Sequence, residues 1–407
     1  MTDALVRIRD LCYEAVGVPD WLTPVYIELD SASVDNAPAL QAQLDALPNG
    51  IPGYPTTAIL PAGEYAMKEV GPFTGVALRD KQHVRLTGPA VLRWSDYGPY
   101  NSATAHWERR HFVIADCHDV EVSGLTILGE HEELSQYGGQ RAKYIAAHEY
   151  QHGFEIARST DIILNDLTVE QVGGDGFYLN DVIGLKSENV TVTRNGRQGI
   201  GGVLGSDWYW DGLTITHSAR SGIDWEPNGG VDRVDRTTFI NSFIRGSTLG
   251  VQIQRGTDLT IRDSTVEGRI KLSSSGGSLH DRNVTLDNLD LYVNHGSVGR
   301  DSPIIQAVSF GTLSVTNCRA SKPTGDIRSE LSAFIRLYDP SLHGHLIVRD
   351  NVATNYVTAV QCRLSDAEKD VLVAASTFDI GNNDLGNGIV EGMPDWIASR
   401  TGTDDGN

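Results

Sequence analysis

Apolar residues recur at helical spacing in two short segments, and at alternate positions through most of the remaining chain. The helical spacing over residues 2–17 and 37–47 predicts two amphipathic helices. Further along, runs such as DVEVSGLTIL, DIILNDLTVE and DLTIRDSTVEG alternate apolar and polar residues, which is typical of strands with one buried face. We therefore expect a mainly β protein.

The strand segments form an internal repeat. A motif of Gly, an apolar residue, any residue and usually a second apolar residue recurs in steps of 23, 23, 23 and 28 residues, starting at Gly153, Gly176, Gly199, Gly222 and Gly250. Periods of this size indicate a solenoid, and the absence of helical spacing within each unit favours a β-helix. Stacked coils would place equivalent strands in parallel, about 4.8 Å apart.

This pattern divides the chain into three predicted parts. Residues 1–22 form an N-terminal amphipathic helix or cap, 23–383 form a β-helix of about 10–12 coils, and 384–407 form a C-terminal tail. Insertions near 93–110 and 128–151 interrupt the stack, and long loops in a solenoid usually mark its working face.

Several segments resemble a known superfamily. Gly-x-apolar coils with N-V-T-V and D-L-T-I strands resemble right-handed parallel β-helix proteins of the pectate-lyase-like superfamily. The segment DNAPALQAQLDALPNG…AILPAGEYAM, residues 35–67, resembles the opening of phage tailspikes and minor tail proteins. NGRQGI and SGIDWEPN resemble a pair of segments in bacterial and phage members. The resemblance implies an all-β, right-handed parallel β-helix over most of residues 30–380.

Composition narrows the range of partners. The net charge of −20 argues against nucleic acid and anionic membrane surfaces. No run approaches 18 apolar residues, so membrane insertion is not expected. The start of the chain lacks the pattern of a Sec signal peptide. The four cysteines form no CxxC pair, so we expect free buried thiols, no metal site and no cofactor; converging carboxylates leave calcium open.

SGIDWEPN supplies the first candidate acids. With Ile223 and Trp225 facing inward, Asp224 and Glu226 face outward with Cα atoms roughly 6.6 Å apart. Paired carboxylates at such spacing suit glycoside hydrolysis, although an outward acid pair is often only solvated. The repeat places these acids in two polar columns, which are Glu155, Tyr178, Gly201, Asp224 and Gln252, and Ala157, Asn180, Val203, Glu226 and Gln254.

A third column precedes each repeat glycine and contains His152 and Asp175. QHGFEI and GGDGFYL loosely resemble segments of polygalacturonase-like hydrolases, in which an acid and a His act, but here the order is reversed and G-D-D is absent. A His152–carboxylate hydrogen bond would raise the pKa of the imidazole. Asp175 could equally be a turn residue.

The candidate catalytic residues are therefore Asp224, Glu226, Asp175 and Glu155, although Glu155 lies three coils from Asp224, roughly 14 Å away. Arg197 is either a substrate contact or a turn residue. Aromatic and polar neighbours complete the predicted substrate-binding set, which is His152, Tyr178, Arg197, Gln252, Trp208 and Trp210.

We expect a tailspike-like protein that binds and hydrolyses a host surface polysaccharide, located in a phage tail or outside the cell. A homotrimer and contacts with other tail proteins are part of this expectation. One alternative is a structural or adhesive minor tail protein without catalysis. Another is a bacterial lyase or epimerase, which the acid-rich stripe disfavours because uronate elimination needs cations.

Overall fold

The computed structural model describes most of the chain between residues 23 and 383. The predicted helix over 2–17, most of the insertion near 93–110, half of the insertion near 128–151 and the tail lie outside the described residues. Within that span the described ranges are 23–68, 74–94, 110–131, 144–229, 232–273, 283–292, 303–307, 310–321, 333–337, 344–354, 358–362, 377–381 and residue 383.

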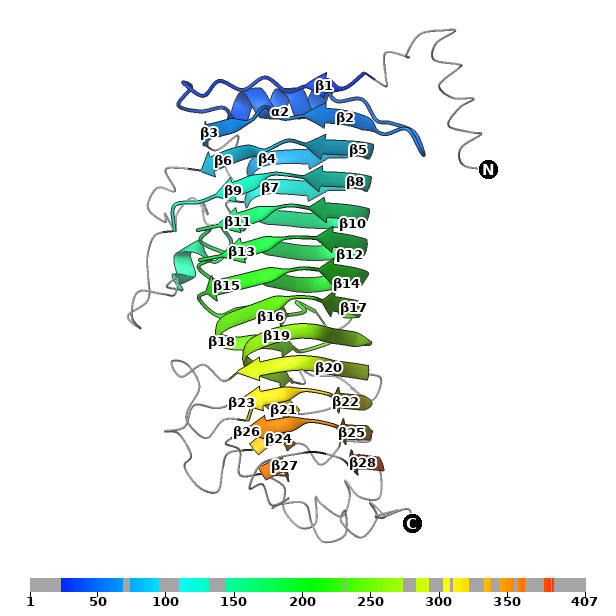
Figure 1. The fold of residues 1–407 in the computed structure, drawn as a ribbon. Helices are drawn as coiled ribbons and strands as arrows, with labels where there is room; N and C mark the ends of the chain where they lie inside the picture. Colours follow the sequence, from blue (N-terminus) through cyan, green and yellow to red (C-terminus); the bar gives the residue numbers. More distant parts are fainter. Residues whose placement is uncertain are drawn as a thin grey trace.

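The described residues form a parallel β-helix whose coils stack along one axis (Figure 1). Every strand pair with a named register is parallel, as the repeat predicts. The first face of the helix carries the Gly-apolar motif and includes β4 (Thr74–Arg79), β7 (Arg110–Ala115), β16 (Ser221–Trp225), β21 (Ile305–Ala307), β24 (Ala333–Leu337) and β27 (Thr358–Cys362).

The other two faces are built in the same way from strands that stack coil on coil. The second comprises β1 (Val25–Tyr26), β2 (Thr56–Ile59), β5 (Gln82–Thr87), β8 (His118–Ser123), β17 (Val234–Ile240), β22 (Thr312–Thr316), β25 (His345–Arg349) and β28 (Thr377–Gly381). The third comprises β3 (Gly63–Met67), β6 (Ala90–Trp94), β9 (Thr126–Leu128), β11 (Thr168–Glu170), β13 (Thr191–Thr193), β15 (Thr214–Ser218), β23 (Arg319–Ser321) and β26 (Val352–Thr354).

Six longer strands run from one face into the next and so join the faces within a coil. They are β10 (Phe154–Asn165), β12 (Phe177–Glu188), β14 (Ile200–Asp211), β18 (Phe243–Ile253), β19 (Leu259–Leu272) and β20 (Asn283–Tyr292). A short 3-10 helix, η2 (Ala146–His148), precedes β10.

The apolar position after each repeat glycine builds one inward column of the core. Its stacked rings include Phe154 and Phe177, whose centroids lie 5.1 Å apart with planes at 5°. The column contains eleven residues, in agreement with the predicted 10–12 coils: Val76, Phe112, Phe154, Phe177, Ile200, Ile223, Val251, Ile270, Ile305, Ile335 and Val360.

One helix covers the N-terminal end of the stack. α2 (Ala37–Ala46) confirms the helix predicted over 37–47, and it buries Leu40 and Leu44 in the core. Gln41 fixes it to β4, because its amide group exchanges two hydrogen bonds with the backbone of Ala77, at 2.9 and 2.7 Å. The exposed end of the first coil is thus closed by a helix, as a solenoid requires.

The similarity between DIILNDLTV and DLTIRDSTV reflects stacked turns. Asp161, Asp166, Asp258 and Asp263 all adopt the left-handed conformation, with φ between 52° and 55°. Asp and Asn tolerate this conformation better than other side chains that carry a Cβ. Their side chains also link successive coils, as where Asn189 Nδ2 donates to Asp166 Oδ1 at 2.6 Å.

Two of the four cysteines have described side chains. Cys117 and Cys318 are free and buried, as predicted, and burial raises the pKa of the Cys117 thiol to about 11. Among the described residues, no helix has the length and apolar character needed to cross a membrane.

Candidate functional site

The first predicted column exists as a continuous outward row on the first face. Tyr178 pairs with Glu155 and with Gly201, and Asp224 pairs with Gly201 and with Gln252. The second predicted column is wrong at its centre, because a bulge pairs Asn180 with Leu204 instead of Val203. Strand β16 ends at Trp225, so Glu226 leaves the sheet immediately after it.

Asp224 faces away from the core as predicted, but it is not a solvated surface acid. Only 2% of the residue is exposed. Gln198 Nε2 donates to Asp224 Oδ2 at 2.7 Å, and Gln252 Nε2 donates to Oδ1 at 3.1 Å from the other side. Burial, followed by the charge of Glu226, raises the pKa of Asp224 to about 7.

Asp175 is a second buried acid and not a simple turn residue. It is fully buried, and its Oδ2 accepts a hydrogen bond from Arg197 Nη1 at 2.8 Å. Its Oδ1 accepts from the backbone N–H of Gln198 at 3.1 Å. Burial raises the pKa of Asp175 to about 6, although the Arg197 guanidinium opposes that rise.

Arg197 holds two of the candidate acids at once. Its Nη2 lies 2.5 Å from Oε2 of Glu226, whose side chain is 40% exposed, while Nη1 binds Asp175. Burial lowers the pKa of Arg197, but the charges of Asp175, Glu226 and Glu149 outweigh burial and raise it. Arg197 is therefore permanently charged, and its charge is already matched by carboxylates.

His152 is neutral, which corrects the predicted rise in its pKa. Its ring stacks on Tyr178 with centroids 4.5 Å apart and planes at 6°. Nδ1 accepts a hydrogen bond from the backbone N–H of Asp175 at 3.1 Å, whereas the Asp175 carboxylate lies 3.6 Å away. Burial, followed by the nearby charge of Arg197, lowers the pKa of His152 well below its ordinary value. The neutral imidazole therefore carries its proton on Nε2.

Gly201 interrupts the row between Tyr178 and Asp224. A Cβ at this position would lie 2.5 Å from Asp175 Oδ2 and 2.9 Å from Gln198 Oε1. The Gln198 Oε1 atom is buried and has no hydrogen-bond partner among the described residues. A side chain therefore does not fit at this position, because the Asp175 carboxyl and the Gln198 side chain already fill the space over Gly201. In the sequence, the sign of this close packing is that Gly201 is a glycine within an otherwise polar column.

Two predicted substrate contacts are wrong. Trp208 and Trp210 are 1% and 0% exposed, so both rings are in the core and cannot reach a glycan. Trp208 Nε1 donates to the carbonyl of Val182 at 2.9 Å. Its ring packs edge to face on that of Trp225, with ring centroids 5.2 Å apart. Trp225 is buried as predicted.

Glu155 stands apart from the buried acids. Its carboxylate forms an ion pair with Arg110, and its side chain is 13% exposed. Among the described residues, no three His, Cys, Asp or Glu side chains are grouped to hold a metal ion. The structure therefore gathers His152, Asp175, Tyr178, Arg197, Asp224, Glu226 and Gln252 into one site and leaves Glu155 at its margin.

Comparison with known proteins supports the fold. No protein-family profile and no curated protein matches the chain. The catalytic unit of a GH87 α-1,3-glucanase from Streptomyces thermodiastaticus matches with a TM-score of 0.54 and 15% identity, over 90% of this chain and 69% of that one. A mutant tailspike of the E. coli bacteriophage HK620, in complex with a pentasaccharide, matches with a TM-score of 0.53 and 12% identity, over 88% and 65%.

The A-module of the mannuronan C-5 epimerase AlgE6 from Azotobacter vinelandii also matches. Its TM-score is 0.51 and its identity 16%, over 88% of this chain and 96% of the module. The chain spans only 60% of a matching Geobacillus virus protein and 65% of the HK620 tailspike. These likenesses confirm the predicted parallel β-helix fold.

Proposed function

We propose that this chain binds a polysaccharide and hydrolyses its glycosidic bonds, with Asp224 as general acid and Glu226 as the carboxylate partner. The observation that carries the proposal is the environment of Asp224. A general acid must hold its proton at the working pH, and burial beside Glu226 raises the pKa of Asp224 to about 7. The second carboxylate must be ionised and reachable, and Glu226 is the exposed acid that Arg197 binds.

Asp175 and Arg197 act in this scheme as positioning residues. Both carboxyl oxygens of Asp175 are engaged, one by Arg197 Nη1 and the other by the backbone N–H of Gln198, which suits a positioning role. It anchors the Arg197 guanidinium, which in turn fixes Glu226 beside the Asp224 strand. Gln198 and Gln252 orient the Asp224 carboxyl from the two neighbouring coils. Tyr178 and Asn228, which are 3.4 Å apart between Oη and Nδ2, border the same row and supply hydrogen-bonding groups for sugar hydroxyls.

The biological setting is part of the proposal. The HK620 tailspike binds a pentasaccharide and the GH87 protein is a glucanase, and both share this fold. We therefore infer a protein of a phage tail or the cell exterior that acts on a host surface polysaccharide, as a homotrimer and in contact with other tail proteins. Light scattering coupled to size exclusion tests the trimer, and a stable monomer at micromolar concentration would contradict it.

Product analysis tests the chemistry. The wild type, Asp224→Asn and Glu226→Gln would be incubated with purified neutral and anionic bacterial surface polysaccharides, and reducing ends measured. We expect either variant to lose about 10²–10⁴-fold of the activity, as is usual when a general acid or base is removed. Asp207→Asn is the matched control, because Asp207 forms an exposed surface pair with Arg236. Full activity in both site variants would overturn the assignment.

A second candidate reaction is elimination or C-5 epimerisation on a uronate chain. It is favoured by the neutral His152 ring stacked on Tyr178, a pair able to remove and return a proton. It is opposed by Arg197, whose charge is already matched by Asp175 and Glu226 and is not free for a uronate carboxylate. Unsaturated products detected by ultraviolet absorbance, or inverted sugars detected by NMR, would favour this reaction over hydrolysis.

A further inference from the structure

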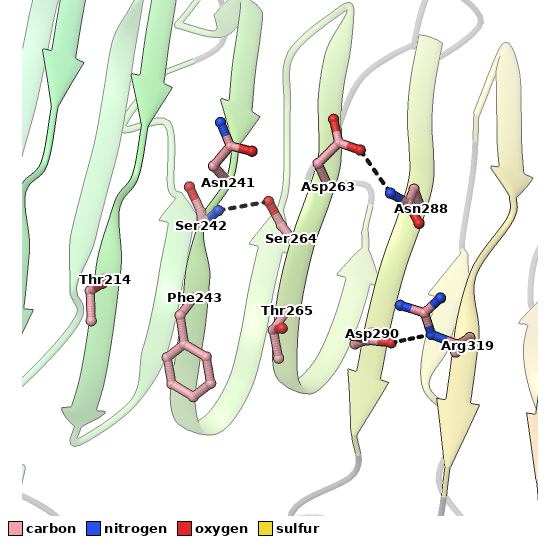
Figure 2. Close-up of a pocket in the computed structure, with 10 residues that line it drawn as sticks. All are labelled: Thr214, Asn241, Ser242, Phe243, Asp263, Ser264, Thr265, Asn288, Asp290 and Arg319. Carbon is pink, nitrogen blue, oxygen red and sulfur yellow. Dashed lines mark hydrogen bonds and ion pairs between the residues drawn. The ribbon is translucent and has the colours of Figure 1, made fainter.

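A groove of ≈ 460 Å³ lies on the third face, away from the buried acids (Figure 2). It runs across five neighbouring coils, which contribute β15, β18, β19, β20 and β23. Asn241, Asp263 and Asn288 line it on one side, all with left-handed backbone at the turns, and the outward residues of the third face line it on the other. Its length along the axis is about 19 Å, from four steps of about 4.8 Å between Thr214 and Arg319.

Between Thr126 and Arg319, the outward column that borders the groove contains polar residues and one aromatic residue, Phe243. Strand pairing stacks Phe243 between Thr214 and Thr265, in the column Thr126, Thr168, Thr191, Thr214, Phe243, Thr265, Asp290 and Arg319. The neighbouring Ile244 faces inward and is fully buried, so the core does not require an aromatic ring at Phe243. Phe243 remains partly exposed, and Figure 2 shows its ring beside the polar side chains of the groove.

The charges of the groove are already paired. Arg319 Nε lies 2.7 Å from Asp290 Oδ1, and Arg262 Nη1 lies 2.7 Å from Asp263 Oδ2. Asn288 Nδ2 also donates to Asp263 at 2.8 Å. The two acids of the lining are thus balanced by Arg319 and by Arg262, which lies beside the lining. The groove offers hydroxyl, amide and carboxylate groups for hydrogen bonds, without a net charge that would select an ionic ligand.

We propose that this groove is a second, non-catalytic binding site for a neutral saccharide chain. A sugar ring presents C–H groups on its faces and hydroxyl groups at its edges. The Phe243 ring offers an apolar surface for such a face, and the turn residues Asn241, Asp263 and Asn288 offer partners for the hydroxyls. The groove follows the solenoid axis, so it suits an extended polymer. The site is independent of catalysis at Asp224.

Phe243→Thr tests the proposal, because it restores the threonine column of the neighbouring coils. Binding would be measured by affinity gel electrophoresis in dextran, pullulan, mannan and laminarin, with polygalacturonate as the anionic comparison. We expect at least one neutral polymer to retard the wild type. Phe243→Thr should weaken this binding about tenfold. Phe243→Leu keeps an apolar side chain but removes the flat ring, and it should also weaken binding to the neutral polymer.

Two controls separate this site from the acidic one. Tyr26→Thr removes an aromatic ring that is 68% exposed at the N-terminal end, far along the stack from the groove, and should bind like the wild type (Figure 1). Asp224→Asn should lose hydrolysis but keep its binding to the neutral polymer. The proposal is overturned if no neutral polymer binds, or if both Phe243 variants bind like the wild type. It is also overturned if those variants instead change the oligomeric state, which would make the groove an interface between copies.

Discussion

Gln198 Nε2 lies 2.7 Å from Asp224 Oδ2, so an amide on one coil caps the acid of the next. The same Gln198 donates its backbone N–H to Asp175 at 3.1 Å. One residue therefore contacts both acids with raised pKa values, and its own side-chain oxygen stays without a partner among the described residues. Burial raises both pKa values, against the lowering effect of the Gln198 backbone hydrogen bond on Asp175, so protonation of the two acids depends on the folded structure.

The free energy of unfolding should consequently depend on pH through Asp224. A carboxyl group whose pKa is raised on folding binds more protons when folded. Its contribution to stability is full below the unfolded pKa near 3.9 and is lost as the pH rises through the folded pKa, about 7 for Asp224. Between pH 5 and pH 8 this loss amounts to about 2–3 kcal/mol. Asp175, with a pKa of about 6, acts in the same direction.

Guanidinium unfolding of wild type and Asp224→Asn at both pH values measures the effect. Comparing the two proteins is necessary because His152, whose pKa is lowered, titrates with the opposite sign in both. We expect Asp224→Asn to lose the Asp224 share of the pH dependence. Asp207→Asn should keep the wild-type dependence, since the pKa of Asp207 is lowered by its hydrogen bond to Arg236. Identical pH dependence in wild type and Asp224→Asn would contradict a raised pKa.

Removing only one member of the Arg197–Asp175 ion pair should lower the free energy of unfolding strongly. Arg197→Met leaves a buried carboxylate without its cation, and such losses cost about 3–5 kcal/mol. Adding Asp175→Asn removes the unpaired charge, so the double variant should be less destabilised than the sum of the single variants. Arg236→Met removes an exposed pair with Asp207 and should cost far less than Arg197→Met, because solvent screens exposed pairs. If Arg197→Met costs no more than Arg236→Met, the buried network does not stabilise the fold.

The fold can be predicted from the sequence because every coil must bury an apolar residue at the same position. The apolar residue after each repeat glycine must face inward, so the 23-residue step gave the register from Phe154 to Ile223 directly. The step of 28 residues before Gly250 was also accommodated, since Asp224 pairs with Gln252 as predicted. The bulge that pairs Asn180 with Leu204 could not be predicted, because Gly201 and Gly202 carry no pattern of their own.

The site can be predicted only in part, because the sequence pattern carries less information about it. Alternation tells which side of a sheet a residue faces, but not what covers that side. The alternation therefore predicts that Asp224 lies on an exposed stripe. In the structure, Gln198 and Gln252 enclose its carboxyl group instead. The pKa of His152 is lowered by burial and then by the charge of Arg197, and the repeat does not encode the approach of Arg197 from two coils further along.

Gly201→Ala should disturb the site without straining the backbone, because only steric contact is involved. The added Cβ would lie 2.5 Å from Asp175 Oδ2 and must displace that carboxyl or Gln198. We expect at least a tenfold loss of polysaccharide cleavage. Gly229→Ala is the control, since its Cβ would come no closer than 3.2 Å to a side-chain oxygen of Asp232. Wild-type cleavage by Gly201→Ala would show that the absence of a side chain at Gly201 has no role in the proposed reaction.

The run Trp208–Tyr209–Trp210 provides a direct test of what faces the core. Residues two apart on a strand share a side, so the two tryptophans point inward while Tyr209, at 38% exposure, points out. Trp208→Ala should cost about 3–5 kcal/mol in unfolding free energy, since it removes a buried ring that contacts Trp225. Tyr209→Ala should change it by less than about 0.5 kcal/mol. Guanidinium unfolding followed by circular dichroism measures both. A selective loss of glycan binding in Trp208→Ala, at unchanged stability, would instead restore this tryptophan to the binding surface.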